Sequence, residues 1–369
     1  MASLPPLHWR PIRRAAFRSI RQGRVTGRSV AWTLAMGGAL LASRAVLRGL
    51  HRLDDRLHPG WRRTKVRSPL IILTCPRSGS TRLQRLLALD DERFTTFKLY
   101  QSVFPSVTLD HVAARGRPIL SRHFGALASL IGTLFPEFQH VHSLGLDLPE
   151  EDEALFVHSL LSPTLMMLFP CETAEDLFSV DGLCKSERAA VMRIYREALM
   201  RHLHAAGVGR TLLIKNVWSA SRLETLLEEF PDARVVCIRR DPSHAVTSAT
   251  SMFSIPWRAL FPERRTDGPE YQAFARRMQR YYRRYDELAE RLDDSRVHVV
   301  DYEQLTRDPL VALSALYAHF NWAIPERIVA RLKEDAERPY RSAHRYSPAD
   351  FGLSRDVILD DLRDIWPDK

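Results

Sequence analysis

Four short apolar runs, separated by stretches of helical periodicity, constrain the fold of this chain most strongly. They occupy residues 69–74, 211–215, 234–238 and 297–300 and are rich in Ile, Leu and Val. Runs of this length and composition are typical of buried strands. The first two are followed by segments that repeat Leu at helical spacing. Strands that alternate with helices predict an α/β fold with a central parallel sheet flanked by helices.

A further helix is predicted over residues 271–292, where aromatic and aliphatic side chains recur every three or four residues. The apolar stripe indicates a core-facing side, and the Arg residues between its members indicate a solvated side. At 369 residues the chain is long enough for one large domain with a small appendage. We therefore expect a main domain over residues 65–369, preceded by a basic N-terminal segment over residues 1–64.

The N-terminal segment has an unusual charge pattern. Residues 1–28 are rich in Arg and contain no acidic residue, and residues 29–43 are uncharged. The uncharged run is shorter than the roughly 20 apolar residues that cross a bilayer. Farther on, Leu residues alternate with Arg44, Arg48, Arg52 and Arg56, which predicts an amphipathic helix with a cationic face. Such a helix either lies on an anionic membrane surface or packs on the domain with its Arg residues in water.

The segment after the first strand has the composition of a phosphate-binding loop. Residues 75–81 read Cys-Pro-Arg-Ser-Gly-Ser-Thr and lead into a helix. Gly79 allows the backbone to approach an anion, and the amides of Gly79, Ser80 and Thr81 are unpaired donors at a helix start. Arg77 adds a forked cation. The loop lacks the second Gly and the Lys of a Walker A motif, and no Gly-x-Gly-x-x-Gly dinucleotide motif occurs in the chain.

A second candidate anion site follows the third predicted strand. Arg240 stands at the strand end, Asp241 and Pro242 suit a helix start, and Ser248 lies two turns into that helix. Ligands bind beyond the carboxyl ends of parallel strands, so we expect Arg240 and Ser248 to lie near the first loop.

Together these two segments resemble the PAPS-dependent sulfotransferase family, in its bacterial-type branch. PAPS is 3'-phosphoadenylyl sulfate. The resemblance covers residues 65–369 and implies a P-loop-like sulfotransferase fold. It implies that Arg240 and Ser248 hold the 3'-phosphate. It also implies that five residues of the loop hold the 5'-phosphosulfate, namely Arg77, Ser78, Gly79, Ser80 and Thr81.

The resemblance extends to residues 300–305, where Tyr302 is expected near the adenine. Cytosolic animal members have Lys in place of Arg77 and Trp in place of Arg82, and their C-terminal Arg-Lys-Gly loop is missing here. Arg345 and Tyr346 are the candidates for closing over the nucleotide in its place.

Sulfuryl transfer is expected to depend on positioning and charge stabilisation, by analogy with phosphoryl transfer. Arg77, the loop amides and Lys215 suit that role, and no metal site is expected. Many relatives place a His base where this chain has Ser219, which is not a useful base. The acidic run 150–153 is therefore the expected source of the base, because crowded carboxylates raise one pKa when partly buried. Glu151 and Glu153 are the first candidates and His142 is the next.

The acceptor and the location of the protein follow from weaker features. Residues 94–169 are apolar and aromatic with few charges before the acidic run, which favours a lipidic, aromatic or glycolipid alcohol over a highly charged glycan. A small-molecule, lipid or carbohydrate alcohol is the expected acceptor. The four Cys show no metal-ligand spacing, which indicates a reducing, cytoplasmic location with membrane association through the N-terminus left open. The net charge of +10 admits nucleic acid, but no sequence-reading motif supports a specific nucleic-acid partner.

Two other functions remain open at this stage. In a nucleotide kinase or NTPase, residues 297–301 would form a Walker B strand with Asp301 as the Mg²⁺ ligand, but the Walker Lys is missing. In a non-enzymatic protein, the Arg-rich N-terminus would bind a membrane or nucleic acid by charge alone.

Overall fold

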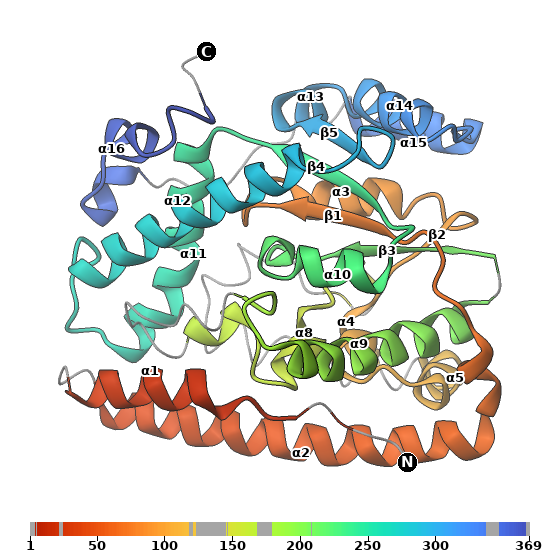
Figure 1. Cartoon of the computed structure of the whole chain (residues 1–369), viewed down its shortest axis with the longest axis horizontal. Helices are drawn as coiled ribbons and strands as arrows, with labels where there is room; N and C mark the ends of the chain where they lie inside the picture. Colours follow the sequence, from red (N-terminus) through yellow and green to blue (C-terminus); the bar gives the residue numbers. More distant parts are fainter. Residues whose placement is uncertain are drawn as a thin grey trace.

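The structure is a computed structural model, and it describes residues 4, 6–21, 25–117, 121–122, 145, 147–167, 179–207, 209–336 and 347–366. Its centre is a parallel sheet in the order β2-β3-β1-β4-β5 (Figure 1). The strands are β1 Leu70–Thr74, β2 Phe94–Thr95, β3 Thr211–Lys215, β4 Arg234–Arg239 and β5 Val297–Asp301. The α/β fold and the four predicted strands are confirmed. β2 was not predicted, because two residues carry no periodicity.

Helices surround this sheet. Their bounds are α1 Trp9–Arg21, α2 Gly27–Leu57, α3 Ser80–Leu87, α4 Leu99–Val103, α5 Val107–Arg115, α8 Glu153–Val157, α9 Lys185–Ala206, α10 Leu223–Glu229, α11 Pro242–Leu260, α12 Pro269–Glu290, α13 Tyr302–Arg307, α14 Pro309–His319, α15 Glu326–Ala336 and α16 Arg355–Asp360. Short 3₁₀ turns occupy Pro59–Arg63, Pro163–Met167, Ser219–Ser221 and Pro348–Phe351.

The alternation of side chains along β1 divides the interior into two cores. Ile71 and Leu73 belong to a core that α9, α10, α11 and α12 cover. Leu70 and Ile72 belong to the other, which α3, α14 and α15 cover. All four side chains are fully buried, as expected for a central strand whose successive residues face opposite sides of the sheet. The predicted aromatic stripe of α12 lies in the first core, so that helix and its facing are confirmed.

The N-terminal segment forms longer helices than its hydrophobicity pattern indicated. The uncharged run and the Arg-containing stretch after it belong to one helix of 31 residues, α2. By length and composition alone, α2 could cross a membrane, which corrects the estimate from the uncharged run by itself. Interspersed Arg residues lower the local hydropathy without interrupting backbone hydrogen bonding, so the helix continues past them.

The C-terminal end of α2 is tied to the main domain through a buried carboxylate. Asp54 is fully buried and accepts hydrogen bonds from Ser106 Oγ at 2.9 Å and from the Thr108 amide at 2.8 Å. Arg201 of α9 lies 3.3 Å from the same carboxylate, and its guanidinium stacks 3.7 Å from the centre of the Trp61 ring. The N-terminal segment therefore packs directly against the main domain. The domain boundary at residue 64 stays a prediction.

Candidate active site

The loop between β1 and α3 places its glycine at the start of the helix, as the sequence predicts. Gly79 is the N-cap of α3 with φ +85°, in the left-handed region that glycine adopts without strain. A Cβ atom built on Gly79 would come within 2.8 Å of the Tyr302 ring. Glycine is thus required here both by the turn and by the close approach of Tyr302, which begins α13 directly after β5.

The two candidate phosphate segments are in direct contact. The Arg77 Nε atom donates a hydrogen bond to Ser248 Oγ at 3.1 Å, although 171 residues separate them. The Arg240 guanidinium donates to the backbone carbonyl of Arg77. β1 and β4 are neighbours and parallel, so the loops that leave their carboxyl ends meet at one edge of the sheet.

Arg240 is held between an aromatic ring and the backbone. Its guanidinium lies 4.1 Å from the centre of the Tyr302 ring, and its own carbonyl accepts a hydrogen bond from Tyr282 Oη at 2.7 Å. The helix that carries Ser248 starts as expected, with Pro242 in its first turn and Asp241 as N-cap accepting from the Ser243 amide at 2.8 Å. Among the described residues, the buried Arg240 Nε atom has no hydrogen-bond partner.

The loop also contains an unsatisfied hydroxyl. Ser78 is fully buried, and its Oγ atom has no hydrogen-bond partner within the described part of the chain. A buried hydroxyl without a partner is uncommon unless a ligand or water completes it. Ser78 Oγ and Arg240 Nε are therefore two donors in one region, and this arrangement fits an anionic group bound between the loop and β4.

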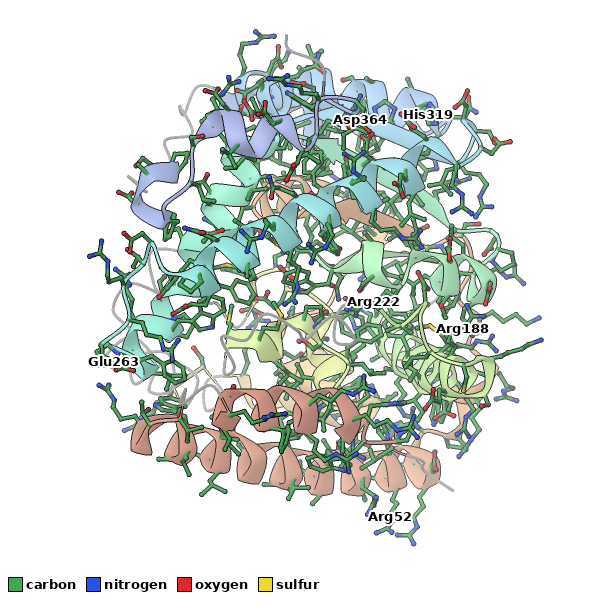
Figure 2. All side chains as sticks on the ribbon, turned by 60° about the vertical axis from the view of Figure 1, so that its left-hand side comes forward. Arg52, Arg188, Arg222, Glu263, His319 and Asp364 are labelled. Carbon is green, nitrogen blue, oxygen red and sulfur yellow. The ribbon has the colours of Figure 1, made fainter. Side chains whose placement is uncertain are left out.

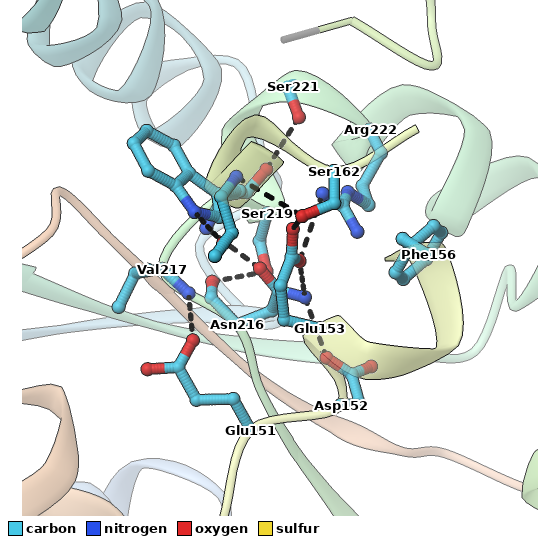
Figure 3. Close-up of polar contacts among 12 residues, drawn as sticks. Glu151, Asp152, Glu153, Phe156, Ser162, Asn216, Val217, Ser219, Ser221 and Arg222 are labelled. Carbon is cyan, nitrogen blue, oxygen red and sulfur yellow. Dashed lines mark hydrogen bonds and ion pairs between the residues drawn. The ribbon is translucent and has the colours of Figure 1, made fainter. Parts of the chain in front are cut away.

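Lys215 links the phosphate loop to the acidic run. It ends β3, is almost fully buried, and donates from Nζ to Thr81 Oγ1 at 3.1 Å. The same Nζ atom forms an ion pair with Glu151. The other carboxylate oxygen of Glu151 lies 3.5 Å from the Val217 amide nitrogen, as Figure 3 shows. Thr81, Lys215 and Glu151 therefore form a continuous polar chain at the carboxyl ends of β1 and β3.

Glu153, the other acidic candidate, lies in a separate, buried network. Its carboxylate accepts from Asn216 Nδ2 at 2.6 Å and forms an ion pair with Arg222 at 3.2 Å (Figure 3). Asn216 Nδ2 also donates to Asp152 at 2.8 Å. The Arg222 guanidinium stacks 3.7 Å from the centre of the Phe156 ring. Glu153 thus anchors the acidic run against the residue that follows Lys215, whereas Glu151 faces Lys215 itself.

Burial raises the pKa of Glu153 to about 7, while Arg222 and the hydrogen bonds from Ser162 and Asn216 act in the opposite direction. The neighbouring Asp152 carboxylate makes only a smaller upward contribution. The pKa of Glu153 is therefore shifted upward, as expected for one carboxyl of this acidic run. The main cause of this shift is removal of the carboxyl from water, and the crowding of like charges is secondary.

Replacing Glu153 by Gln should change how stability depends on pH. Because the folded-state pKa lies above the unfolded value, the carboxyl contributes stability below about pH 4.5 that is lost as the pH rises towards 7. The free energy of unfolding of the wild type, relative to Glu153→Gln, should fall by roughly 3 kcal/mol over this range. Denaturant unfolding of both proteins across that range measures it. A difference that is constant with pH would contradict the burial of this group.

The remaining sequence candidates are placed as follows. Ser219, at the position where many relatives have His, is fully buried. Its hydroxyl donates a hydrogen bond to the Asn216 carbonyl at 2.8 Å and so stabilises the turn after β3. Asp301 accepts from the Gln304 amide at 2.8 Å and caps α13. His142, Arg345 and Tyr346 lie outside the described residues. Sequence reasoning missed Asn216, although a polar amide directly after a strand-ending Lys was a signal for it.

Comparison with known proteins gives the family. The profile described as the sulfotransferase family matches residues 69–326. Two proteins named omega-hydroxy-beta-dihydromenaquinone-9 sulfotransferase Stf3, from Mycobacterium bovis and Mycobacterium tuberculosis, are each 26% identical over 278 residues. These alignments cover 72% of this chain and 66% of each relative, so the chain spans just under two thirds of their length.

Solved structures of similar fold include sulfotransferase STF9 from Mycobacterium avium, with a TM-score of 0.69, 22% identity, and coverage of 87% of this chain and 82% of that one. Sulfotransferase STF1 from Mycobacterium tuberculosis H37Rv gives a TM-score of 0.70 at 20% identity, covering 89% and 86%. These two likenesses confirm the P-loop-like sulfotransferase fold. Since the family profile matches well over half of its length, this chain belongs to the sulfotransferase family.

Proposed function

We propose that this sulfotransferase takes its sulfuryl group from PAPS, held between the β1–α3 loop and the β4–α11 segment. The observation that carries the proposal is the contact between Arg77 and Ser248 at 3.1 Å, which joins the two segments that the family resemblance assigns to the 5' and 3' phosphates. Ser78, Gly79, Ser80 and Thr81 would hold the 5' end through hydroxyls and helix-start amides. Arg240 and Ser248 would hold the 3'-phosphate, with Tyr302 beside the adenine.

PAPS supplies an activated sulfuryl group whose leaving phosphate gains negative charge during transfer. Arg77 and Lys215 provide fixed positive charge at the loop, and the α3 amides add donors, so the chain stabilises that charge without reorganising. Glu151 is the group that accepts the proton of the acceptor hydroxyl. Its ion pair with Lys215 directs the carboxylate toward the loop.

The acceptor in this proposal is a lipid-like alcohol. The relatives named above act, according to their names, on an omega-hydroxylated dihydromenaquinone, an apolar molecule with a terminal hydroxyl. The aromatic and apolar character of residues 94–169 supports an acceptor of this kind over a glycan.

A cytoplasmic location at the membrane is part of the same proposal. Among the described residues Cys75, Cys184 and Cys237 are free thiols, and Cys184 is exposed. Free exposed thiols are ordinary in a reducing compartment. The long N-terminal helix α2 supports contact with the membrane.

The test compares two labelled donors with a panel of acceptors. The protein should transfer label from ³⁵S-labelled PAPS to long-chain or isoprenoid alcohols, and transfer none from γ-³²P-labelled ATP. Transfer of phosphate without sulfate would reverse the donor assignment in favour of a kinase. Sulfation restricted to anionic glycans would refute the lipid acceptor while leaving the donor assignment intact.

A further inference from the structure

The N-terminal helices α1 and α2, with the connection between them, carry most of the large apolar side chains that are exposed in the described part of the chain. Of fifteen large apolar side chains exposed in the described residues, eleven lie in residues 9–57. Every exposed position from residue 30 to residue 46 is Ala, Gly, Val, Leu or Met. At 1.5 Å per residue this apolar stretch is about 25 Å long. Apolar surface of this extent is rare on a protein face that meets only water.

The apolar stretch is followed directly by a cationic one. Arg48, Arg52 and Arg56 are exposed and spaced four residues apart, so they lie on one side of the helix. Figure 2 shows Arg52 projecting away from the body of the molecule. The first 53 residues contain ten Arg and no Asp or Glu. The charge of this face is therefore complementary to an anionic surface.

Contacts along the inner side of α2 determine how the helix can meet a bilayer. At its start, Thr26 Oγ1 donates to the Leu260 carbonyl at 3.1 Å. In the middle, Arg44 donates to the carbonyl of His158. Near its end, His51 contacts the Pro105 carbonyl at 3.2 Å and Asp54 is buried among donors from α5. If α2 crossed a bilayer, these polar partners and the helices that carry them would have to enter hydrocarbon as well.

We propose that α2 docks in the plane of an anionic phospholipid bilayer, with the exposed apolar side chains of residues 30–46 inserted at the interface and Arg48, Arg52 and Arg56 on the lipid phosphates. The helix is long enough to span, but its attachment to the domain at both ends keeps it parallel to the surface. Figure 1 places α1 and α2 together along one edge of the molecule, where both can face the same surface. The inference does not depend on the proposed donor or acceptor.

Vesicle flotation with the full chain tests the docking surface. The protein should bind vesicles that contain phosphatidylglycerol, bind pure phosphatidylcholine vesicles weakly, and dissociate at high salt. The variant Leu34→Glu/Leu41→Glu should bind about a hundredfold more weakly, because it removes two inserted apolar side chains. The variant Arg48→Gln/Arg52→Gln should bind about thirtyfold more weakly to anionic vesicles.

Matched controls come from the opposite side of the molecule. Val311 of α14 and Val357 of α16 are exposed to a similar degree, and Val311→Glu/Val357→Glu should leave vesicle binding unchanged. Circular dichroism and the binding of adenosine 3',5'-bisphosphate should be the same in all variants, which separates lost docking from lost folding or lost activity.

Three results would overturn the proposal. One is equal binding of wild type and the Leu34→Glu/Leu41→Glu variant to anionic vesicles. Another is a dimer of the wild type that this variant dissociates, which would mean that the face is covered by a second copy. The third is retention of the expressed protein in membranes after alkaline carbonate extraction, which would mean that α2 spans the bilayer.

Discussion

Replacing Glu151 by Gln is expected to lower kcat for sulfuryl transfer by about 10²- to 10⁴-fold, the range typical of a lost general base. Gln has nearly the same shape, so contact with the Val217 amide is retained, while the carboxylate and the ion pair with Lys215 are lost. The affinity for adenosine 3',5'-bisphosphate, measured by calorimetry, should change little, because Glu151 is not assigned to the nucleotide. The reduction would then belong to the chemical step.

Glu153→Gln is the matched control, two residues away in the same acidic run. Its carboxylate contacts Asn216 and Arg222 and not Lys215, so this variant should lose at most about tenfold in kcat. It should instead show the altered pH dependence of stability described above. If Glu153→Gln lost activity by three orders of magnitude and Glu151→Gln kept it, the two roles would have to be exchanged.

Arg240→Ala is expected to weaken binding of adenosine 3',5'-bisphosphate by about 10- to 150-fold. The estimate follows from the 1.5–3 kcal/mol that hydrogen bonds to a charged partner typically contribute, at about 1.36 kcal/mol for each factor of ten. The variant also removes the cation stacked on Tyr302 and the bond to the Arg77 carbonyl, so the loop itself loses support. Arg77→Ala should also clearly lower the affinity for adenosine 3',5'-bisphosphate, because it removes the proposed contact with the 5'-phosphate.

Arg239→Ala provides the control for this substitution. Arg239 is the last residue of β4, directly before Arg240, and its guanidinium contacts Asp286 at 3.1 Å and the Ile365 carbonyl at 3.1 Å. Its removal should alter thermal stability and leave nucleotide affinity within about twofold, since its guanidinium contacts Asp286 and the Ile365 carbonyl, which have no part in the proposed phosphate site. Equal losses in Arg239→Ala and Arg240→Ala would mean that general positive charge, and no defined phosphate site, binds the nucleotide.

The structure separates side chains that the sequence presents as equivalent. Glu151, Asp152 and Glu153 are consecutive acids, and their composition gave no basis for choosing among them. The choice depends on Lys215, Asn216 and Arg222, which lie more than 60 residues away and approach the acidic run from β3 and the turn after it. Glu151 precedes α8, Asp152 is its N-cap and Glu153 is its first helical residue, so the three side chains leave the backbone in different directions and reach different partners.

The extent of α2 is a second feature that required the structure. Hydropathy indicated an uncharged run that ends at Arg44, because each Arg lowers a local average. Helix formation follows backbone hydrogen bonding and propensity, in which Arg ranks high, so the helix continues to Leu57. Its in-plane attachment depends on the burial of Asp54 and His51 against α5 and the segment before it, which no local pattern reveals.

What the amino-acid order alone determined is the set of local elements. Short runs rich in β-branched residues, a glycine where the backbone turns left-handed, and an Asp-Pro helix start act through forces between near neighbours. These features predicted the four strands that the structure confirms and the two candidate phosphate segments. The tertiary structure alone decided which distant groups meet: the strand order around β1, the contact between Arg77 and Ser248, and the division of the acidic run. The physical reason is that burial and electrostatic pairing depend on groups brought together by folding, whereas strand and helix formation depend largely on residues close in the chain.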